Sequence, residues 1–183
     1  MSDNLHMKAG KGSGGYSLNM ILSRRSIRKY QPREVRQTDI DHILAAGDAA
    51  PCAMGRRSWH FIVIRDRSVL DSIPEFHPYS KMIREAPLAI LVCADTAIED
   101  NEGYWVQNCS AATENILLGA RSMGLGSVWL GIYPRKERIS GIRKLLEVPE
   151  NIVPFSLAVI GHPAEEKTPH MGYDPDRVHL DRW

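Results

Sequence analysis

The chain has 183 residues, of which 43% are hydrophobic and 25% charged, with a formal net charge of +1 at pH 7. This length and composition indicate one globular domain with a sizeable core, and they exclude a disordered chain and the broad positive field of a nucleic-acid-binding surface. The three cysteines show no close pairing, no apolar run reaches the length of a membrane span, and the N-terminus lacks the order of a signal peptide, so we expect a cytoplasmic protein without a membrane partner.

The N-terminal part of the chain combines a glycine-rich segment with a short run in which apolar residues recur at helical spacing. Glycine is frequent and apolar residues are scarce over residues 1–15, which predicts a flexible lead-in before a single domain over residues 16–183. Apolar residues at helical spacing begin at Leu18 and predict a short helix that ends at the basic stretch Ser23–Arg28. Because a helix C-terminus favours cations, this position helps to hold the stretch even without a ligand.

A second helix is predicted to begin at Thr38, because Thr38 with Asp41 three residues later resembles a capping box, and Pro51 should end it. Farther along the chain, runs of β-branched and aromatic residues alternate with apolar residues at helical spacing. They predict strands over 59–65, 88–94, 127–133 and 153–160 and helices over 103–123 and 135–146.

These elements point to a fold class. The longest predicted helix should form the spine of the core, and the strand over 88–94, apolar on both faces, should be central in its sheet. Several connections are too short or irregular for a regular doubly wound sheet, so the predicted class is mixed α+β. The tail over 162–183 has no helical period. Its last residues include the apolar Val178, Leu180 and Trp183, which indicates that the end of the tail packs against another part of the protein.

The basic stretch Ser23–Arg28 places three arginines and two serines in six positions of a nearly neutral chain. A guanidinium group matches phosphate oxygens with a planar fork of donors, and Ser26 adds a short hydroxyl. Arg24 and Arg28 share a face if the backbone is helical. The stretch therefore predicts a phosphate site. The alternatives are a solvated surface turn and a nucleic-acid contact, and the near-neutral composition argues against nucleic acid.

Catalytic sets are otherwise missing from the sequence. The histidines lack metal-ligand spacing, so no metal is expected, and the chain has no nucleophile elbow and no dinucleotide-binding glycine fingerprint. If the protein is an enzyme, a bound cofactor carries the difficult chemistry. Small residues over 49–59 and glycines around the strand that follows Gly124 would let the backbone approach a flat ligand closely, although each feature alone also fits a packing or turn role.

Taken together and in order, the motifs of the chain resemble those of the FMN-dependent nitroreductase family, in its short single-domain branch. The resemblance covers about residues 17–183. It rests on Arg24–Arg28, on Ala50 and Pro51 leading to Trp59–Val63, on Ala111 and Ala112 with Asn115, on Gly124–Gly126 with Trp129 and Gly131, and on Gly161–Lys167.

The resemblance implies a mixed central sheet flanked by helices and a homodimer with two FMN sites at its interface, where a C-terminal extension reaches over the partner. It implies that the phosphate and ribityl end of FMN is held by Arg24, Arg25, Ser26 and Arg28. The flavin would be touched from the other subunit by Pro51, Cys52, Ala53 and Met54. Its isoalloxazine ring would be lined by Trp129, Leu130 and Gly131, with a backbone N–H near N5. In the tail, Lys167 and His170 are the nearest matches to the basic residues that help to bind the phosphate.

The activity implied is that of an FMN-dependent NAD(P)H oxidoreductase. With NADH or NADPH as the electron donor, it would reduce nitroaromatic, quinone or similar flat electron-poor acceptors in two half-reactions. Tyr79 and Met82, between the first two strands, are candidate substrate contacts. A flavin-binding or sensing module without turnover and a flavin-fragmenting or dehalogenating relative are the alternatives.

The chain also departs from the family pattern before Trp59. Gly55 and Arg57 stand where the family often has Asn and Gln, and Ser58 replaces a common Pro. These departures concern the pyrimidine edge of the flavin.

Overall fold

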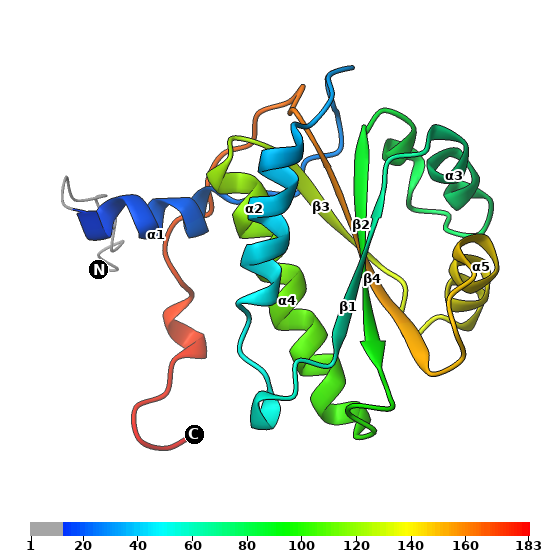
Figure 1. Ribbon diagram of the computed structural model, residues 1–183. Helices are drawn as coiled ribbons and strands as arrows, with labels where there is room; N and C mark the ends of the chain where they lie inside the picture. Colours follow the sequence, from blue (N-terminus) through cyan, green and yellow to red (C-terminus); the bar gives the residue numbers. More distant parts are fainter. Residues whose placement is uncertain (1–12) are drawn as a thin grey trace.

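The computed structural model describes residues 13–183 and is built around one antiparallel sheet (Figure 1). The strands are β1 (Trp59–Ile64), β2 (Leu88–Asp95), β3 (Gly126–Gly131) and β4 (Ile152–Gly161). They lie in the order β1-β2-β4-β3, and every neighbouring pair is antiparallel. An isolated parallel bridge joins Ser26 to Ser127 at the β3 edge, so the sheet is extended there by the basic stretch.

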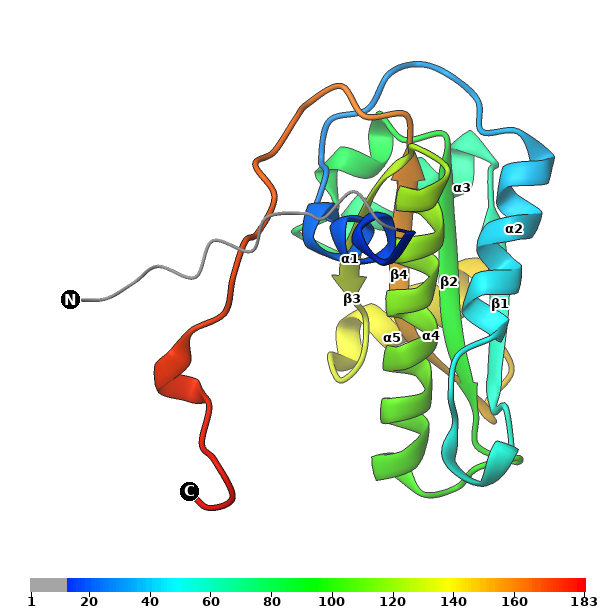
Figure 2. The same cartoon turned by 90° about the vertical axis from the view of Figure 1, so that its left-hand side faces the viewer.

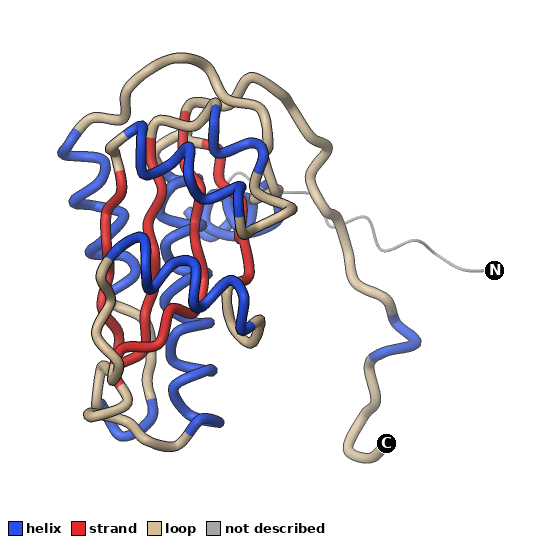
Figure 3. Tube along the Cα trace, turned by 90° about the vertical axis from the view of Figure 1, so that its right-hand side faces the viewer, coloured by secondary structure: helices blue, strands red, loops and turns tan. Residues whose placement is uncertain are grey.

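Helices cover both faces of the sheet. The helices are α1 (Ser13–Ser23), which projects from the body of the domain, and α2 (Gln37–Asp48), α3 (Arg67–Ser72), α4 (Glu102–Ser122) and α5 (Lys136–Leu146), which cover the sheet. Figure 1 shows α2 and α4 packed on one face of the sheet and α3 and α5 on the other. In Figure 3 the face that carries α3 and α5 is turned toward the viewer. This arrangement confirms the predicted α+β class. The predicted lead-in over residues 1–15 lies outside the described residues, except for residues 13–15, which open α1.

The sequence of β2 explains why this strand is central. All of its residues are buried, and alternate side chains enter different cores. Leu88, Ile90, Val92 and Ala94 pack with α2 and α4, whereas Ala89, Leu91 and Cys93 pack with α3 and α5. A strand that is covered on both faces reads as a continuous apolar run, which is the pattern that predicted it.

The start of α2 differs from the prediction. The helix begins at Gln37 with Arg36 as its N-cap residue, and no side chain caps it, so the proposed box of Thr38 and Asp41 is wrong. Thr38 already lies inside the first turn, and Asp41 instead accepts a hydrogen bond from Gln37 Nε2 at 2.8 Å. The helix also ends at Asp48, before Pro51.

The tail leaves the body of the domain after β4, as Figure 2 shows from the side. Its first part is anchored, because Ala164 N donates to Lys29 O and His170 N donates to Leu22 O, each at 2.9 Å. Beyond a short 3-10 turn at Pro175–Arg177, the tail ends with exposed apolar side chains: Val178 is 52%, Leu180 86% and Trp183 101% exposed. The expected packing of this end is therefore not provided by the described residues of the same chain.

Among residues 13–183, no helix combines the length and the apolar character needed to cross a membrane.

We predict that Gly141→Ala destabilises the domain by about 1–3 kcal/mol, because overpacking a core contact costs this much. A Cβ at Gly141 in α5 would lie 2.3 Å from Cγ of Phe76, so the helix would have to move off the aromatic ring. Urea denaturation measures the change. Ser140→Ala, on an exposed position of the same helix, is the control and should change stability little. Equal unfolding midpoints for the two variants would contradict the prediction.

Candidate functional site

The basic stretch forms an extended edge next to β3. Ile27 N donates to Ser127 O at 2.9 Å, so the backbone here is extended, and the condition under which Arg24 and Arg28 would share a helical face is not met. Ile27 is buried and anchors the stretch. A Cβ at Gly126 would lie 2.8 Å from Ile27 Cγ2, so a glycine is needed for this close approach of the stretch to β3.

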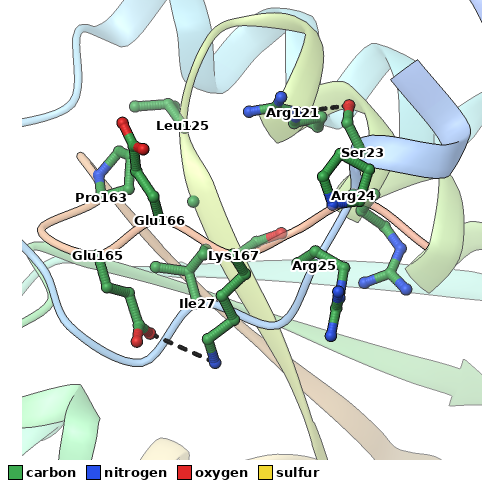
Figure 4. A pocket seen from close by; sticks show the side chains of 13 residues that line it. Ser23, Arg24, Arg25, Ile27, Arg121, Leu125, Pro163, Glu165, Glu166 and Lys167 are labelled. Carbon is green, nitrogen blue, oxygen red and sulfur yellow. Dashed lines mark hydrogen bonds and ion pairs between the residues drawn. The ribbon is translucent and has the colours of Figure 1, made fainter. Parts of the chain in front are cut away.

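A first pocket of about 290 Å³ opens between this stretch and the tail (Figure 4). The cations that line it are Arg24, Arg25, Arg121 and Lys167, and the carboxylates are Glu165 and Glu166. In Figure 4 the side chains of Arg25 and Lys167 extend to the same side of the pocket. The lining thus carries four cationic and two anionic side chains. The two positive charges that remain match the two negative charges of a phosphate dianion.

Each predicted phosphate-binding cation of the first pocket has a partner in the described chain. Arg24 Nε lies 3.1 Å from Glu114 Oε1 on α4, and Arg25 Nη1 donates to Thr168 O in the tail. Lys167 Nζ donates to Ser26 O at 2.7 Å and lies 3.6 Å from Glu165 Oε1. These contacts tie the basic stretch to the tail and hold the cations around one cavity.

Glu165 completes this arrangement. Its Oε1 accepts a hydrogen bond from Arg28 N at 2.5 Å. This backbone bond and, after it, the charge of Lys167 lower the pKa of the Glu165 carboxyl group. The carboxylate therefore stays ionised and fixes the backbone between Ser26 and Arg28.

A second pocket, of about 500 Å³, lies at the end of β3. Six of the predicted residues line it: Arg28, Tyr79, Met82, Trp129, Leu130 and Gly131. The structure thus brings together Arg28, the stretch expected to line a flat ring and both candidate substrate contacts, which come from three distant parts of the chain. His77, Pro78, Lys81 and Arg138 also line this pocket.

The carbonyl of Gly131 is held by two side chains of the second pocket. Arg138 Nη1 donates to Gly131 O at 2.7 Å, and His77 Nε2 lies 3.1 Å from the same oxygen. Because a carbonyl only accepts, Nε2 must carry the proton, which leaves Nδ1 of His77 as an acceptor. This Nδ1 is buried and has no hydrogen-bond partner in the described part of the chain. His77 and Arg138 therefore fix the end of β3.

Burial, and after it the charge of Arg138, lowers the pKa of His77. The folded protein therefore keeps His77 neutral at a pH where the unfolded chain already binds a proton. Stability conferred by the neutral form is complete above the ordinary pKa of about 6.5 and decreases as the pH falls below it.

We predict that the free energy of unfolding decreases between about pH 7 and pH 5 in the wild type and decreases less in His77→Gln, because glutamine does not titrate. The glutamine amide can still donate to Gly131 O. Urea denaturation at a series of pH values measures both slopes. His42→Gln, at an exposed position of α2, should keep the wild-type slope. A His77→Gln slope as steep as that of the wild type would contradict the prediction.

The predicted residues Pro51, Cys52, Ala53 and Met54 lie apart from both pockets. They follow α2, and Figure 1 places their turn at the lower end of the sheet, whereas α1 and the basic stretch lie in the upper half. Ala53 N donates to Asn108 Oδ1 at 2.9 Å, Cys52 is half-buried, and Met54 is exposed. Within one chain this turn does not meet the other predicted residues.

Two further predicted residues contribute through the backbone. Ser26 offers its carbonyl to Lys167, and His170 donates its N–H to Leu22 O, while neither residue lines the two pockets.

Sequence reasoning missed several lining residues. Glu165 and Glu166 stand inside the motif Gly161–Lys167, so their charge next to Lys167 was a usable signal. His77 lies two positions before Tyr79 and was also within reach. Arg138 had no such signal, because its surroundings in the sequence are those of an ordinary charged helix face.

The amino-acid sequence of the chain is similar to that of known proteins. The family model described as the nitroreductase family matches residues 21–76 and 72–162. A protein of Methanothermobacter thermautotrophicus, provisionally named NADH dehydrogenase/NAD(P)H nitroreductase, is 51% identical over 174 residues, which are 95% of this chain and 91% of that protein.

Solved structures are also similar. A crystal structure from Parabacteroides distasonis with the same provisional name is 42% identical, with a TM-score of 0.88 over 92% of this chain and 99% of that one. A provisionally named nitroreductase from Desulfovibrio desulfuricans, solved in complex with FMN, is 30% identical, with a TM-score of 0.79 over 91% of this chain and 97% of that one.

Proposed function

This chain belongs to the nitroreductase family, and on this basis we propose that it is an FMN-dependent NAD(P)H oxidoreductase that reduces nitroaromatics, quinones or similar flat electron-poor acceptors. The observation that carries the proposal is that one short basic stretch contributes residues to two pockets, Arg24, Arg25 and Ile27 to the first and Arg28 to the second. One has the charge of a phosphate site, and the other is bounded by a strand end, an aromatic ring and a methionine. Arg28 belongs to the basic stretch of the first pocket and lines the second.

The donor set of the first pocket fits the phosphate of FMN. Arg24, Arg25 and Lys167 would bind the phosphate oxygens. Their present contacts with Glu114, Thr168 O and Ser26 O are partly exposed, so a phosphate dianion can replace them. Ser26 and Arg28 would bind the ribityl side. FMN supplies the two-electron transfer between NAD(P)H and the acceptor when it is bound.

The second pocket fits a flat ring and a substrate stacked on it. At Gly131 a Cβ would meet only Tyr133 O, at 4.0 Å, so this position leaves room for a ring to lie against the backbone. Trp129 and Leu130 would extend the same wall. Tyr79 and Met82 face this region from the segment between β1 and β2 and would contact the acceptor.

We further propose that the active form is a homodimer. The turn Pro51–Met54 lies away from both pockets in its own chain, so a partner would have to provide it to the flavin. Exposed apolar side chains on α1 and on the tail end, which include Ile21, Leu180 and Trp183, give a partner surface to cover. The tail would then reach over the partner.

The test is an anaerobic titration of the FMN-loaded protein with NADH and, separately, NADPH, followed by visible absorbance. The proposal predicts that the oxidised flavin bands bleach and return on addition of a nitroaromatic or quinone. Tight FMN binding without bleaching by either nucleotide would contradict reductase activity and would favour a flavin-binding module. Failure of the wild type to bind FMN would contradict the cofactor assignment.

A further inference from the structure

The second pocket carries a positive rim with more cations than the one assigned to FMN. Arg28, Lys81 and Arg138 line it, and no carboxylate does so among the described residues. In residues 13–183, none of these three cations has a carboxylate within ion-pair distance. Arg28 is assigned to the cofactor side, so Lys81 and Arg138 remain as cations without an anionic partner.

Arg138 is held in place without being saturated. One of its terminal nitrogens donates to Gly131 O at 2.7 Å, and its guanidinium carbon lies 5.6 Å from the centroid of the Tyr79 ring. A guanidinium group has five N–H donors, so most of them are left for another acceptor. Because the carbonyl and the ring fix the group, little conformational entropy is lost when an anion binds.

Tyr79 provides the second element of the rim. Tyr79 is 71% exposed, although it lines a pocket that also contains Trp129 and Met82. An exposed aromatic ring next to a fixed guanidinium offers a stacking surface at one point and an anion site beside it.

We propose that this rim makes the enzyme selective for flat acceptors that carry an anionic substituent, such as an aromatic carboxylate or sulfonate. Arg138 and Lys81 pair with the anion, and Tyr79 covers the ring. The inference rests on the proposed function and specifies its substrate class. The phosphates of NAD(P)H are a second source of anions for the same rim, so the experiment has an arm for each source.

The experiment compares 4-nitrobenzoate with 4-nitrobenzamide, which share a ring and a nitro group but differ by one charge. Calorimetry measures the binding of each to the oxidised, FMN-loaded protein without NAD(P)H. We expect the wild type to bind the carboxylate at least about tenfold more tightly, since a hydrogen bond to a charged group contributes this much. The preference should decrease as salt is added.

The variants assign the preference to residues. The double variant Lys81→Gln, Arg138→Gln should lose most of the preference, measured as the ratio of the two dissociation constants, because any shift of the Gly131 wall affects both acceptors alike. Arg138→Lys should retain a large part of it, because the charge remains. Lys136→Gln, which removes an exposed cation of α5 outside the pocket, is the matched control and should keep the wild-type ratio.

Steady-state kinetics provides the second arm. The KM values for NADH and NADPH should be alike in the wild type and the double variant, whereas kcat/KM for 4-nitrobenzoate should decrease about tenfold or more. Raised nucleotide KM values with an unchanged benzoate-to-benzamide ratio would overturn the inference in favour of the nucleotide phosphates. Equal binding of the two acceptors by a wild type that reduces 4-nitrobenzamide would overturn the inference alone. A wild type that binds no FMN would overturn both the inference and the proposed function.

Discussion

Replacing Arg24 and Arg28 together by alanine should lower the affinity for FMN by about two to four orders of magnitude, because each charge-assisted hydrogen bond contributes about 1.5–3 kcal/mol. Arg24 lines the first pocket and Arg28 the second, so the pair spans both ends of the proposed cofactor site. Loss of Arg24 also leaves Glu114, now 3.1 Å from its Nε, as a negative charge near the phosphate. Repulsion of the dianion adds to the loss.

Quenching of FMN fluorescence on titration with protein measures this affinity. The matched control is Arg33→Ala with Arg65→Ala, which removes two exposed arginines that line neither pocket and changes the net charge equally. Thermal unfolding of all the variants establishes that they fold. If the control and the double variant bind FMN alike, the basic stretch serves only to anchor the tail through Thr168 and Glu165, and the phosphate site lies elsewhere.

The end of the tail should determine the oligomeric state. We expect the triple variant Val178→Ala, Leu180→Ala, Trp183→Ala to raise the dimer dissociation constant at least about a thousandfold, because burial of each of these side chains contributes roughly 1.5–3 kcal/mol. All three are exposed in the single chain, and Trp183 is fully so. A monomeric variant should also bind FMN weakly, since the turn Pro51–Met54 would be absent from its site.

Sedimentation velocity over a range of concentrations distinguishes dimer from monomer. Asp176→Ala with Arg182→Ala changes two exposed polar residues of the same tail and should leave the dimer intact. A triple variant that remains dimeric at the wild-type concentration would mean that α1 and other surfaces hold the subunits together. A wild type that is monomeric would contradict the dimer itself.

Local sequence patterns predicted most elements of the fold correctly. The continuous apolar run of β2 and the long apolar stripe of α4 depend on neighbours in the chain, and both appear where expected. The cap of α2 was mispredicted because a Thr and an Asp at capping-box spacing compete with other local partners, and here Arg36 pairs with Asp39 and Gln37 with Asp41.

The candidate site divides in the same way. The ordered motifs led to the basic stretch, to Trp129–Gly131 and to Tyr79 and Met82, because each lies in a short segment with its own composition. The amino-acid sequence does not show how far apart these segments lie in the folded chain. Only the antiparallel sheet and the placement of α5 bring Arg28, Tyr79 and Gly131 to one cavity.

By itself, the amino-acid sequence determined the fold class, the central strand and the family of this protein, because periodicity and motif order are properties of neighbouring residues. The tertiary structure decided that the basic stretch is extended, that Glu165 orders its backbone, and that His77 and Arg138 meet at the carbonyl of Gly131. It also decided that the tail end is left uncovered by its own chain. These features depend on contacts between residues far apart in the chain, and such contacts form only when the hydrophobic layers pack.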